Sequence, residues 1–400
     1  MTTLSDAIPG TPAGATQPSP DVLAMIERLV AFPTVSRDSN LGLIEWTRDY
    51  LAGMGVKSRL TYDVSGKKAN LFATLGEGRK PGLILSGHTD VVPVDGQAWD
   101  SDPFKIAIRD GMMFGRGSAD MKGFIGTALA LVPQFLAANM EAPLHLALSY
   151  DEEVGCLGVR SLIADLAQTG LKTAGCIVGE PTMMQPIIAH KGTHRFRCHI
   201  TGREAHSSYT THGVNSIEYA ARIIVYIRQM ADRLAQLETR DYAFTVPFTT
   251  LQTGTIRGGL ASNIVPKECE FQFEARTMPG VAADKLYQEI QDFAATLLPE
   301  MRRVEPNAAI DFEWIASAPG LNMQESDAIV ALASALSRNR PNGAVSYGTE
   351  AGLFQQAGIP TVVCGPGNIE QAHRPNEFVS LIQLAQCEAF MLRLIADARP

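Results

Sequence analysis

Short apolar segments that alternate with helical patterns constrain the fold of this chain most strongly. The alternating segments are apolar runs at residues 71–75, 83–85, 144–149, 175–178 and 361–364, and helical stretches near residues 22–26, 43–54, 124–136, 159–167 and 382–395. Strands that alternate with helices are typical of a sheet whose two faces are covered. The sequence therefore predicts an α/β domain with a mostly parallel sheet covered by helices.

A different pattern occupies residues 188–316. The strand-like segments 194–201, 246–252, 269–275 and 309–315 and the helical segments 216–237 and 283–298 follow the order β-α-β-β-α-β. This order is the ferredoxin-like unit. Because 400 residues exceed what one compact core usually organises, two domains are expected. We predict an inserted α+β domain at 188–316 within a larger domain formed by 20–187 and 317–400.

The N-terminal residues 1–19 are rich in Pro, Thr, Gly and Ala and predict a flexible tail. We expect regular structure to begin at Pro20, with Asp21 as the cap of the first helix. The tail has neither the basic start nor the apolar stretch of a signal peptide. No window reaches the roughly 18 apolar residues that span a bilayer, so no membrane association is expected.

Composition excludes several function classes. The net charge of −8 argues against nucleic acid as a partner, because phosphate backbones require a basic surface. The six cysteines show neither a CxxC pair nor zinc-finger spacing, which indicates reduced thiols and a cytoplasmic protein. These cysteines are Cys156, Cys176, Cys198, Cys269, Cys364 and Cys387.

His88 is the first residue with candidate chemistry. It follows the apolar run 83–85 and Gly87, and ligands of open parallel sheets bind beyond the carboxyl ends of strands. Asp90 lies two residues on, points to the same side in an extended chain, and could accept the other ring N–H of His88. The alternative is a turn histidine beside an aspartate that stabilises its own turn.

Acidic residues and a second histidine follow the other strands. Asp120 stands between a glycine-rich segment and a helix, where it could instead be the helix N-cap. Glu152 and Glu153 belong to a run of three acids that is either a solvated loop or a site whose charge a cation neutralises. Glu180 directly follows the run 175–178, and His373 lies in the loop after the last apolar run.

Together these residues predict a pair of divalent cations. Imidazoles and carboxylates without thiolates suit Zn²⁺, Co²⁺ or Mn²⁺ better than copper or an iron–sulfur cluster. Two cations about 3.5–4 Å apart need one bridging carboxylate, which leaves one histidine and one further acid for each. One of Glu152 and Glu153 is then left over, and a spare carboxylate beside the cations is a general base.

The motifs resemble those of a known family. The segments GHTDVVP, GRGSADMKG, DEEVGC, GEPT and AHRPNE, together with HKGTHRF, GREAHSS, AFTVPFTTL, GGLASN and GTEAG, are similar to those of the dinuclear zinc aminoacylase and carboxypeptidase-like metallohydrolases. The resemblance covers nearly the whole chain from about residue 20. It implies hydrolysis of an amide bond in a small N-acyl amino acid, with two Zn²⁺ or alternatively Co²⁺ ions as cofactors.

The resemblance also implies roles for individual residues. Glu152 would be the general base, and Asp90 would steady His88. The implied ligands are Asp120 as the bridge, His88 and Glu180 for one metal, and Glu153 and His373 for the other. An inactive binding or scaffold protein of the same fold is the alternative of a different class, but such a protein would not need Glu152 or a complete ligand set.

For the inserted domain, the resemblance implies a lid that also forms a homodimer. His206 would reach the partner's active site and stabilise the tetrahedral oxyanion, a contribution often of roughly 3–4 kcal/mol. Arg276 could grip a substrate carboxylate through two hydrogen bonds, and Asn263 could add a donor. Glu350 is a candidate partner for a substrate ammonium group. Each of these four could instead be ordinary loop or domain structure, so the acyl group and side chain of the substrate stay open.

Overall fold

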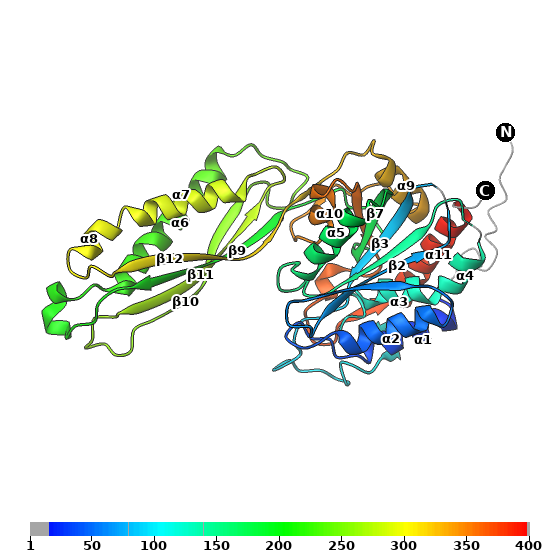
Figure 1. Cartoon of the computed structure of the whole chain (residues 1–400), viewed down its shortest axis with the longest axis horizontal. Helices are drawn as coiled ribbons and strands as arrows, with labels where there is room; N and C mark the ends of the chain where they lie inside the picture. Colours follow the sequence, from blue (N-terminus) through cyan, green and yellow to red (C-terminus); the bar gives the residue numbers. More distant parts are fainter. Residues whose placement is uncertain (1–15, 79, 139, 398–400) are drawn as a thin grey trace. The chain divides into compact units, whose positions relative to one another are not determined.

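The computed structural model describes residues 16–78, 80–138 and 140–397, which form two compact units (Figure 1). Unit 1 comprises Met1–Ile188, Met323–Gly343 and Thr349–Pro400, and unit 2 comprises Ala189–Asn322 and Ala344–Gly348. The predicted insertion had boundaries at 188 and 316, so unit 2 extends a few residues further. Most of the predicted tail, residues 1–15, lies outside the described residues.

Unit 1 is built on a six-stranded sheet with the strand order β1-β2-β6-β3-β7-β15. Its strands are β1 (Ser58–Tyr62), β2 (Ala69–Leu75), β3 (Gly82–His88), β6 (Leu144–Ser149), β7 (Thr173–Pro181) and β15 (Thr361–Gly365). The strands β6, β3, β7 and β15 run parallel, whereas β1 and β2 are antiparallel additions at one edge. The carboxyl ends of the four parallel strands therefore lie at one edge of the sheet.

Both faces of this sheet are covered, as the sequence predicted. Every residue of β3 and β6 is buried, and successive side chains of a strand point to opposite faces. The packed helices, visible around the sheet in Figure 1, are α1 (Pro20–Val30), α2 (Leu41–Ala52), α3 (Lys122–Ala130), α4 (Val132–Ala137), α5 (Gly158–Thr169), α9 (Ala328–Ser337), α10 (Ala351–Gln356) and α11 (Leu381–Asp397). Together these helices confirm the α/β fold class.

Two local predictions in unit 1 need correction. Helix α1 is capped by the hydroxyl of Ser19, which accepts from the Val22 N–H, so Asp21 lies inside the first turn and is not the cap. Pro20 occupies the first helical position, where a missing N–H costs nothing. The helix therefore begins at Pro20 and not after Asp21. The single helix predicted at 124–136 is divided at Leu131 into α3 and α4, the second of which has a proline in its first turn.

Unit 2 contains a four-stranded antiparallel sheet with the order β10-β11-β9-β12. Its elements are β9 (Gly192–Thr201), α6 (Ser216–Leu237), β10 (Thr250–Gly258), β11 (Glu268–Thr277), α7 (Ala283–Ala295), α8 (Leu298–Arg302) and β12 (Ala309–Ala318). This is the predicted ferredoxin-like order. The strand expected at 246–252 starts only at Thr250, because Asp241–Phe248 form turns around Pro247.

The sheet of unit 2 has one apolar and one charged face. Burial alternates strictly along β9 and nearly so along β11, and the buried side chains pack with α6 and α7 into one core that includes Phe196, Ile227, Phe271 and Ile290. The alternate positions carry ion pairs such as Arg197 with Glu270 and with Glu313. A half-exposed sheet of this kind explains the alternating sequence pattern.

Short elements complete the two units. They are β4 (Ala107–Arg109), β5 (Met112–Phe114), β8 (Ala189–His190), β13 (Leu321–Asn322), β14 (Ala344–Val345), β16 (Phe378–Ser380) and the 3₁₀ turns η1 (Ser207–His212) and η2 (Ile369–Gln371). Strands β16, β5 and β4 form one small sheet, and β13, β8 and β14 form another. Among the described residues, no helix is long and apolar enough to cross a membrane.

Candidate metal centre

His88 is the last residue of β3 and is 1% exposed. Gly87 allows α3 to pack closely here, since a Cβ at this position would lie 2.8 Å from the Met121 side chain. The His88 ring lies between two aspartates. Its Nδ1 is 2.9 Å from the backbone carbonyl oxygen of Asp90, and its Nε2 is 2.9 Å from Oδ1 of Asp120. The carbonyl at Nδ1 fixes the tautomer that leaves Nε2 available as a ligand.

Asp90 therefore acts on His88 mainly through its backbone, because its carboxylate is 3.6 Å from Nδ1. That carboxylate accepts hydrogen bonds from the Ser36 hydroxyl at 2.7 Å and from the N–H groups of Glu152 at 3.1 Å and Glu153 at 3.4 Å. Asp90 thus ties the end of β3 to the loop after β6. Sequence reasoning found Asp90 but missed this second set of contacts.

Asp120 lies between the two histidines. Its Oδ1 faces Nε2 of His88, and its Oδ2 is 3.2 Å from Nε2 of His373. The N-cap of α3 is Met121, so the alternative in which Asp120 caps this helix does not hold. A carboxylate whose two oxygens point to two different imidazoles has the geometry of a bridging ligand.

His373 and Glu153 lie together on the other side of Asp120. The Nε2 of His373 is 3.0 Å from Oε2 of Glu153. His373 comes from the loop between β15 and β16 and adopts a left-handed backbone with φ of 63°. Its side chain is 51% exposed within the chain, whereas that of Glu153 is 7% exposed.

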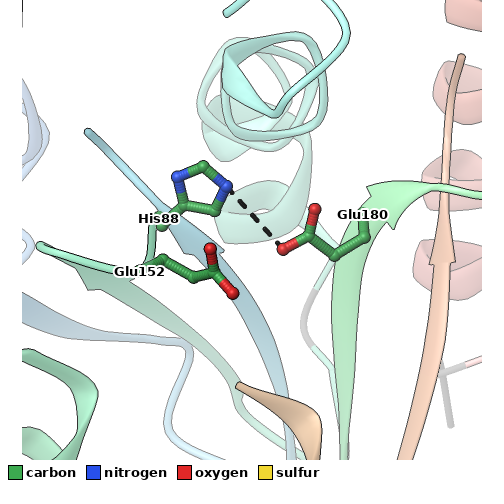
Figure 2. Close-up of side chains that lie close together, drawn as sticks. All are labelled: His88, Glu152 and Glu180. Carbon is green, nitrogen blue, oxygen red and sulfur yellow. Dashed lines mark ion pairs between the residues drawn. The ribbon is translucent and has the colours of Figure 1, made fainter. Parts of the chain in front are cut away.

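Glu180 and Glu152 complete the centre, and Figure 2 shows both carboxylates directed toward the His88 ring. Glu180, near the end of β7, has Oε1 at 3.7 Å from Nε2 of His88. That buried oxygen accepts no hydrogen bond from the described part of the chain. The Cys156 thiol donates to Oε1 of Glu152 over 3.2 Å, a contact that sequence reasoning missed.

The electrostatics of these groups are those of an acidic cluster without enough positive charge. Burial, followed by the neighbouring carboxylates, raises the pKa of Glu152 to about 8 and the pKa of Glu153 to about 7. Burial also raises the pKa of Glu180 well above its usual value. Hydrogen bonds to Asp120 and Glu153 raise the pKa of His373 to about 10. Divalent cations would remove this repulsion.

The donor set fits such cations. Two groups of three residues each offer ligand atoms that lie within 4.8 Å of one another. The first group is His88, Glu152 and Glu180, and the second is His88, Asp120 and Glu153. Within the described residues, Oε1 of Glu180 accepts no hydrogen bond, so this oxygen of the first group is available to a cation. All five predicted ligands and the predicted base are therefore brought together by unit 1.

Glu350 also belongs to unit 1 but lies beneath the surface. It is 0% exposed, and its two carboxylate oxygens accept hydrogen bonds from the hydroxyls of Ser86 at 2.6 Å and Ser149 at 2.7 Å. Ser86 precedes His88 on β3, and Ser149 ends β6. Glu350 therefore holds together the ends of two strands that lead to the centre.

The other three predicted residues belong to unit 2. His206 is exposed and precedes η1, and its Nδ1 accepts the Ser208 N–H at 3.2 Å. Arg276, near the end of β11, donates to both carboxylate oxygens of Glu274 at 2.8 and 3.1 Å and to the Thr193 hydroxyl at 2.8 Å. Asn263 is exposed in the loop between β10 and β11.

An α/β domain with carboxylates and imidazoles gathered at the ends of parallel strands defines a metal-binding hydrolase. Comparison with known proteins specifies the family. Residues 84–397 match the model of peptidase family M20/M25/M40, and the chain belongs to this family. The membership confirms the predictions of a metallohydrolase and of amide-bond cleavage.

Individual relatives extend over nearly the whole chain. It is 37% identical to an acetylornithine deacetylase of Pasteurella multocida, over 94% of this chain and 98% of the relative, and 35% identical to one of Myxococcus xanthus, over 94% and 97%. Among solved structures, a family M20 metallo-carboxypeptidase of Sulfolobus solfataricus matches with a TM-score of 0.74 and 17% identity, over 94% of this chain and 99% of the other. A dinuclear metal-binding peptidase of Bacillus subtilis matches with a TM-score of 0.62 and 17% identity, over 94% and 97%.

Proposed function

We propose that the protein removes the acetyl group from N2-acetyl-L-ornithine to give acetate and L-ornithine, a step of arginine biosynthesis. The position of Asp120 between His88 and His373 carries the reaction class, because it supplies the bridge that a two-cation hydrolase needs. The substrate rests on the full-length similarity to relatives named acetylornithine deacetylase.

In this proposal Asp120 would bridge two divalent cations, Zn²⁺ or alternatively Co²⁺. His88 and Glu180 would complete the ligands of one cation, and Glu153 and His373 would complete those of the other. The bound cations would polarise the acetyl carbonyl and make water a stronger nucleophile. The peptidase of Bacillus subtilis with the same fold, described as dinuclear and metal-binding, supports the cofactor assignment.

Glu152 acts as the general base. It accepts a proton from the attacking water and returns it to the leaving amine of ornithine. Its place beside His88 and Glu180 supports this role, because it brings the carboxylate next to the proposed ligands of one cation (Figure 2). The hydrogen bond from the Glu152 N–H to the Asp90 carboxylate restrains the loop, and the hydrogen bond from the Cys156 thiol restrains the Glu152 carboxylate.

Unit 2 acts as the lid and as the homodimer contact. His206 donates to the developing oxyanion in the active site of a partner copy. Because its Nδ1 already accepts the Ser208 N–H, the neutral ring carries its proton on Nε2, and this is the donor that the role requires. Two features support the dimer contact: the outer edge of β10 pairs with no other strand of the described residues, and its Ile256 is exposed.

Arg276 and Asn263 bind the substrate α-carboxylate in this proposal. The contacts of Arg276 with Glu274 and Thr193 use three of its five N–H groups and hold the guanidinium in place. Glu350 favours a cationic substrate side chain. Its full burial and its bonds to two hydroxyls support an effect of its charge rather than a direct contact.

The substrate is N2-acetyl-L-ornithine rather than the N-succinyl-diaminopimelate of a related desuccinylase, or the substrates of a general aminoacylase or carboxypeptidase. A cytoplasmic location is part of the proposal, and six buried cysteines without disulfides support it. Turnover of a panel of N-acyl amino acids, with Zn²⁺ or Co²⁺ supplied, decides the substrate. Faster hydrolysis of N-succinyl-diaminopimelate than of N-acetylornithine would overturn this assignment.

Replacing Glu152 by Gln tests the mechanism. The amide cannot accept the proton, so we expect kcat to fall by about 10²- to 10⁴-fold while two metal ions remain bound. Metal content by elemental analysis and turnover of N-acetylornithine are measured on the same sample. Glu141→Gln, at an exposed ion pair with Lys80, is the matched control and should keep full turnover. Full turnover of Glu152→Gln would refute the assigned base, and an inactive wild type with two bound metals would indicate a scaffold protein.

A further inference from the structure

Unit 1 contains a fully buried ion pair outside the ligand set. Nη1 of Arg116 donates to Oε2 of Glu377 over 2.7 Å, and both side chains are 1% exposed. The same carboxylate accepts three backbone N–H groups, from Gly117 at 3.0 Å, Ala119 at 3.0 Å and Asp120 at 3.1 Å. One buried carboxylate therefore holds the turn that leads into the bridging aspartate.

The pair is also joined to the loop that carries His373. Glu377 lies four residues after His373, and Arg116 donates from Nη1 to the Arg374 carbonyl at 3.3 Å. The Nη2 of Arg116 donates to Oε1 of Gln97 at 2.6 Å, and Nε2 of Gln97 donates to the His373 carbonyl at 3.1 Å. The ion pair thus contacts the backbone beside two ligands that come from distant parts of the sequence.

His88 and Glu180 are held in another way. They stand on β3 and β7, whose neighbouring strands fix the backbone through ladder hydrogen bonds. Within the described residues, the hydrogen bonds of the Arg116 and Glu377 side chains reach neither strand. Loss of the pair should therefore disturb Asp120 and His373 and leave His88 and Glu180 in place. Because Asp120 would serve both cations, the cation of His88 and Glu180 would have one of its three ligands disturbed, and the cation of Glu153 and His373 would have two.

We propose that Glu377 and Arg116 are positioning residues that set the affinity of the cation bound by Glu153 and His373, while the cation bound by His88 and Glu180 depends on them less. The inference rests on the two-cation site proposed above. A charged acceptor is needed, because four donors converge on one carboxylate, two on each of its oxygens. No neutral side chain of the same shape can accept all four.

Glu377→Gln tests the proposal. Whichever way the amide is oriented, its NH₂ group faces two donors, so two hydrogen bonds are lost. The metal-free wild type, titrated with Zn²⁺ in a calorimeter, should bind two ions. The variant should bind the second ion about 10- to 100-fold more weakly, as is typical when a partner behind a ligand is removed, and the first ion with a clearly smaller loss of affinity. The Co²⁺ absorption spectrum provides a second readout of the two sites.

Glu388→Gln is the matched control, since Glu388 is also buried in unit 1 and accepts a backbone N–H, from Ser19 at 2.8 Å. It should leave both affinities unchanged. Equal weakening of both ions in Glu377→Gln, or no weakening, overturns the inference while the two-ion wild type still supports the proposed function. A wild type that binds fewer than two ions overturns both.

Gln97→Leu provides a variant that is less dependent on folding, because Gln97 is only half-buried. The substitution removes the Gln97 side chain that links Arg116 to the His373 carbonyl. It should selectively lower the affinity for the second ion, by a smaller factor than Glu377→Gln. If Glu377→Gln does not fold, this variant decides: an unchanged second affinity overturns the inference, and a selective loss supports it.

Discussion

At the scale of single residues, the buried carboxylates of unit 1 differ in how many donors they receive. Within the described residues, Glu377 accepts four hydrogen bonds and Asp90 accepts three, whereas Oε1 of Glu180 accepts none. A saturated buried carboxylate is stable as it stands, but an unsaturated one carries a desolvation cost unless something else binds it. The first two are thus suited to hold loops and Glu180 to hold a cation.

His145 provides a prediction on pH dependence at this scale. It is 1% exposed on β6, its Nδ1 lies 3.0 Å from the Thr74 hydroxyl, and burial lowers its pKa to about 4. The unfolded chain binds the proton near pH 6.5, so between pH 6.5 and 4 it holds more protons than the folded chain. The free energy of unfolding should therefore fall as the pH drops through this window, by about 3 kcal/mol from this residue.

Replacing His145 by Gln removes the titrating group and keeps a polar side chain. As the pH drops from 6.5 to 4, the wild type should lose more unfolding free energy than the variant. Above pH 7, the difference between the two proteins should stay constant. Denaturant unfolding of the metal-free proteins measures it, so that ligand binding does not contribute. A difference that is independent of pH would show that folding does not lower the pKa of His145.

At the scale of elements, capping residues at helix ends explain why some helix bounds could be predicted from the sequence. The side chain of Asn215 accepts the N–H groups of Ile217 at 3.1 Å and Glu218 at 3.3 Å, and α6 then runs over Ser216–Leu237 as predicted. The helix buries Ile223 and Ile227 against the sheet of unit 2. Capping and the apolar stripe are both properties of local sequence, so they were visible without the structure.

Removing this cap tests its contribution to stability. Asn215→Ala leaves two N–H groups of α6 without an acceptor and should destabilise unit 2 by about 1 kcal/mol. Asn215→Asp keeps an acceptor and adds a favourable charge at the helix N-terminus, so it should retain wild-type stability. Denaturant unfolding and hydrogen exchange of residues 213–237 measure the effect. Equal stability of all three proteins would mean that the side chain does not cap the helix in solution.

At the scale of the whole molecule, the chain divides its tasks between two units with separate cores. Unit 1 holds all the residues of the candidate centre, and unit 2 holds His206, Asn263 and Arg276. The ferredoxin-like sheet of unit 2 ends at β10, an edge strand with Ile256 50% exposed. Unpaired edges with apolar side chains are natural sites for pairing with another chain.

If this edge forms the homodimer, a charge placed on it should separate the subunits. We expect Ile256→Lys to shift the protein from dimer to monomer and to lower turnover, because His206 would no longer reach a partner's site. Sedimentation velocity gives the mass. Tyr242→Lys, at another exposed apolar residue of unit 2, is the control and should remain a dimer. A monomeric wild type, or a dimeric Ile256→Lys, would contradict this interface.

Parts of the fold and centre could be predicted because their signals are local. The strand Leu144–Ser149 and the helix Ser216–Leu237 have the predicted bounds, since an apolar run or a helical stripe is complete within its own segment. The short strands β5 and β16 were missed, because three residues carry no periodicity and they pair across a long separation in sequence. No pattern in the sequence predicted the hydrogen bond from the Cys156 thiol to the Glu152 carboxylate.

The sequence by itself determined which residues could serve as ligands and that four of the five, all except Asp120, follow the strands of one sheet. His88 and Glu180 could be placed from the strands that carry them, because the carboxyl ends of parallel strands share an edge. Only the tertiary structure decided that the oxygens of Asp120 face His88 and His373, and that Glu377 holds the turn before Asp120. These contacts join loops far apart along the chain, and their geometry depends on how the buried polar groups of both loops satisfy one another.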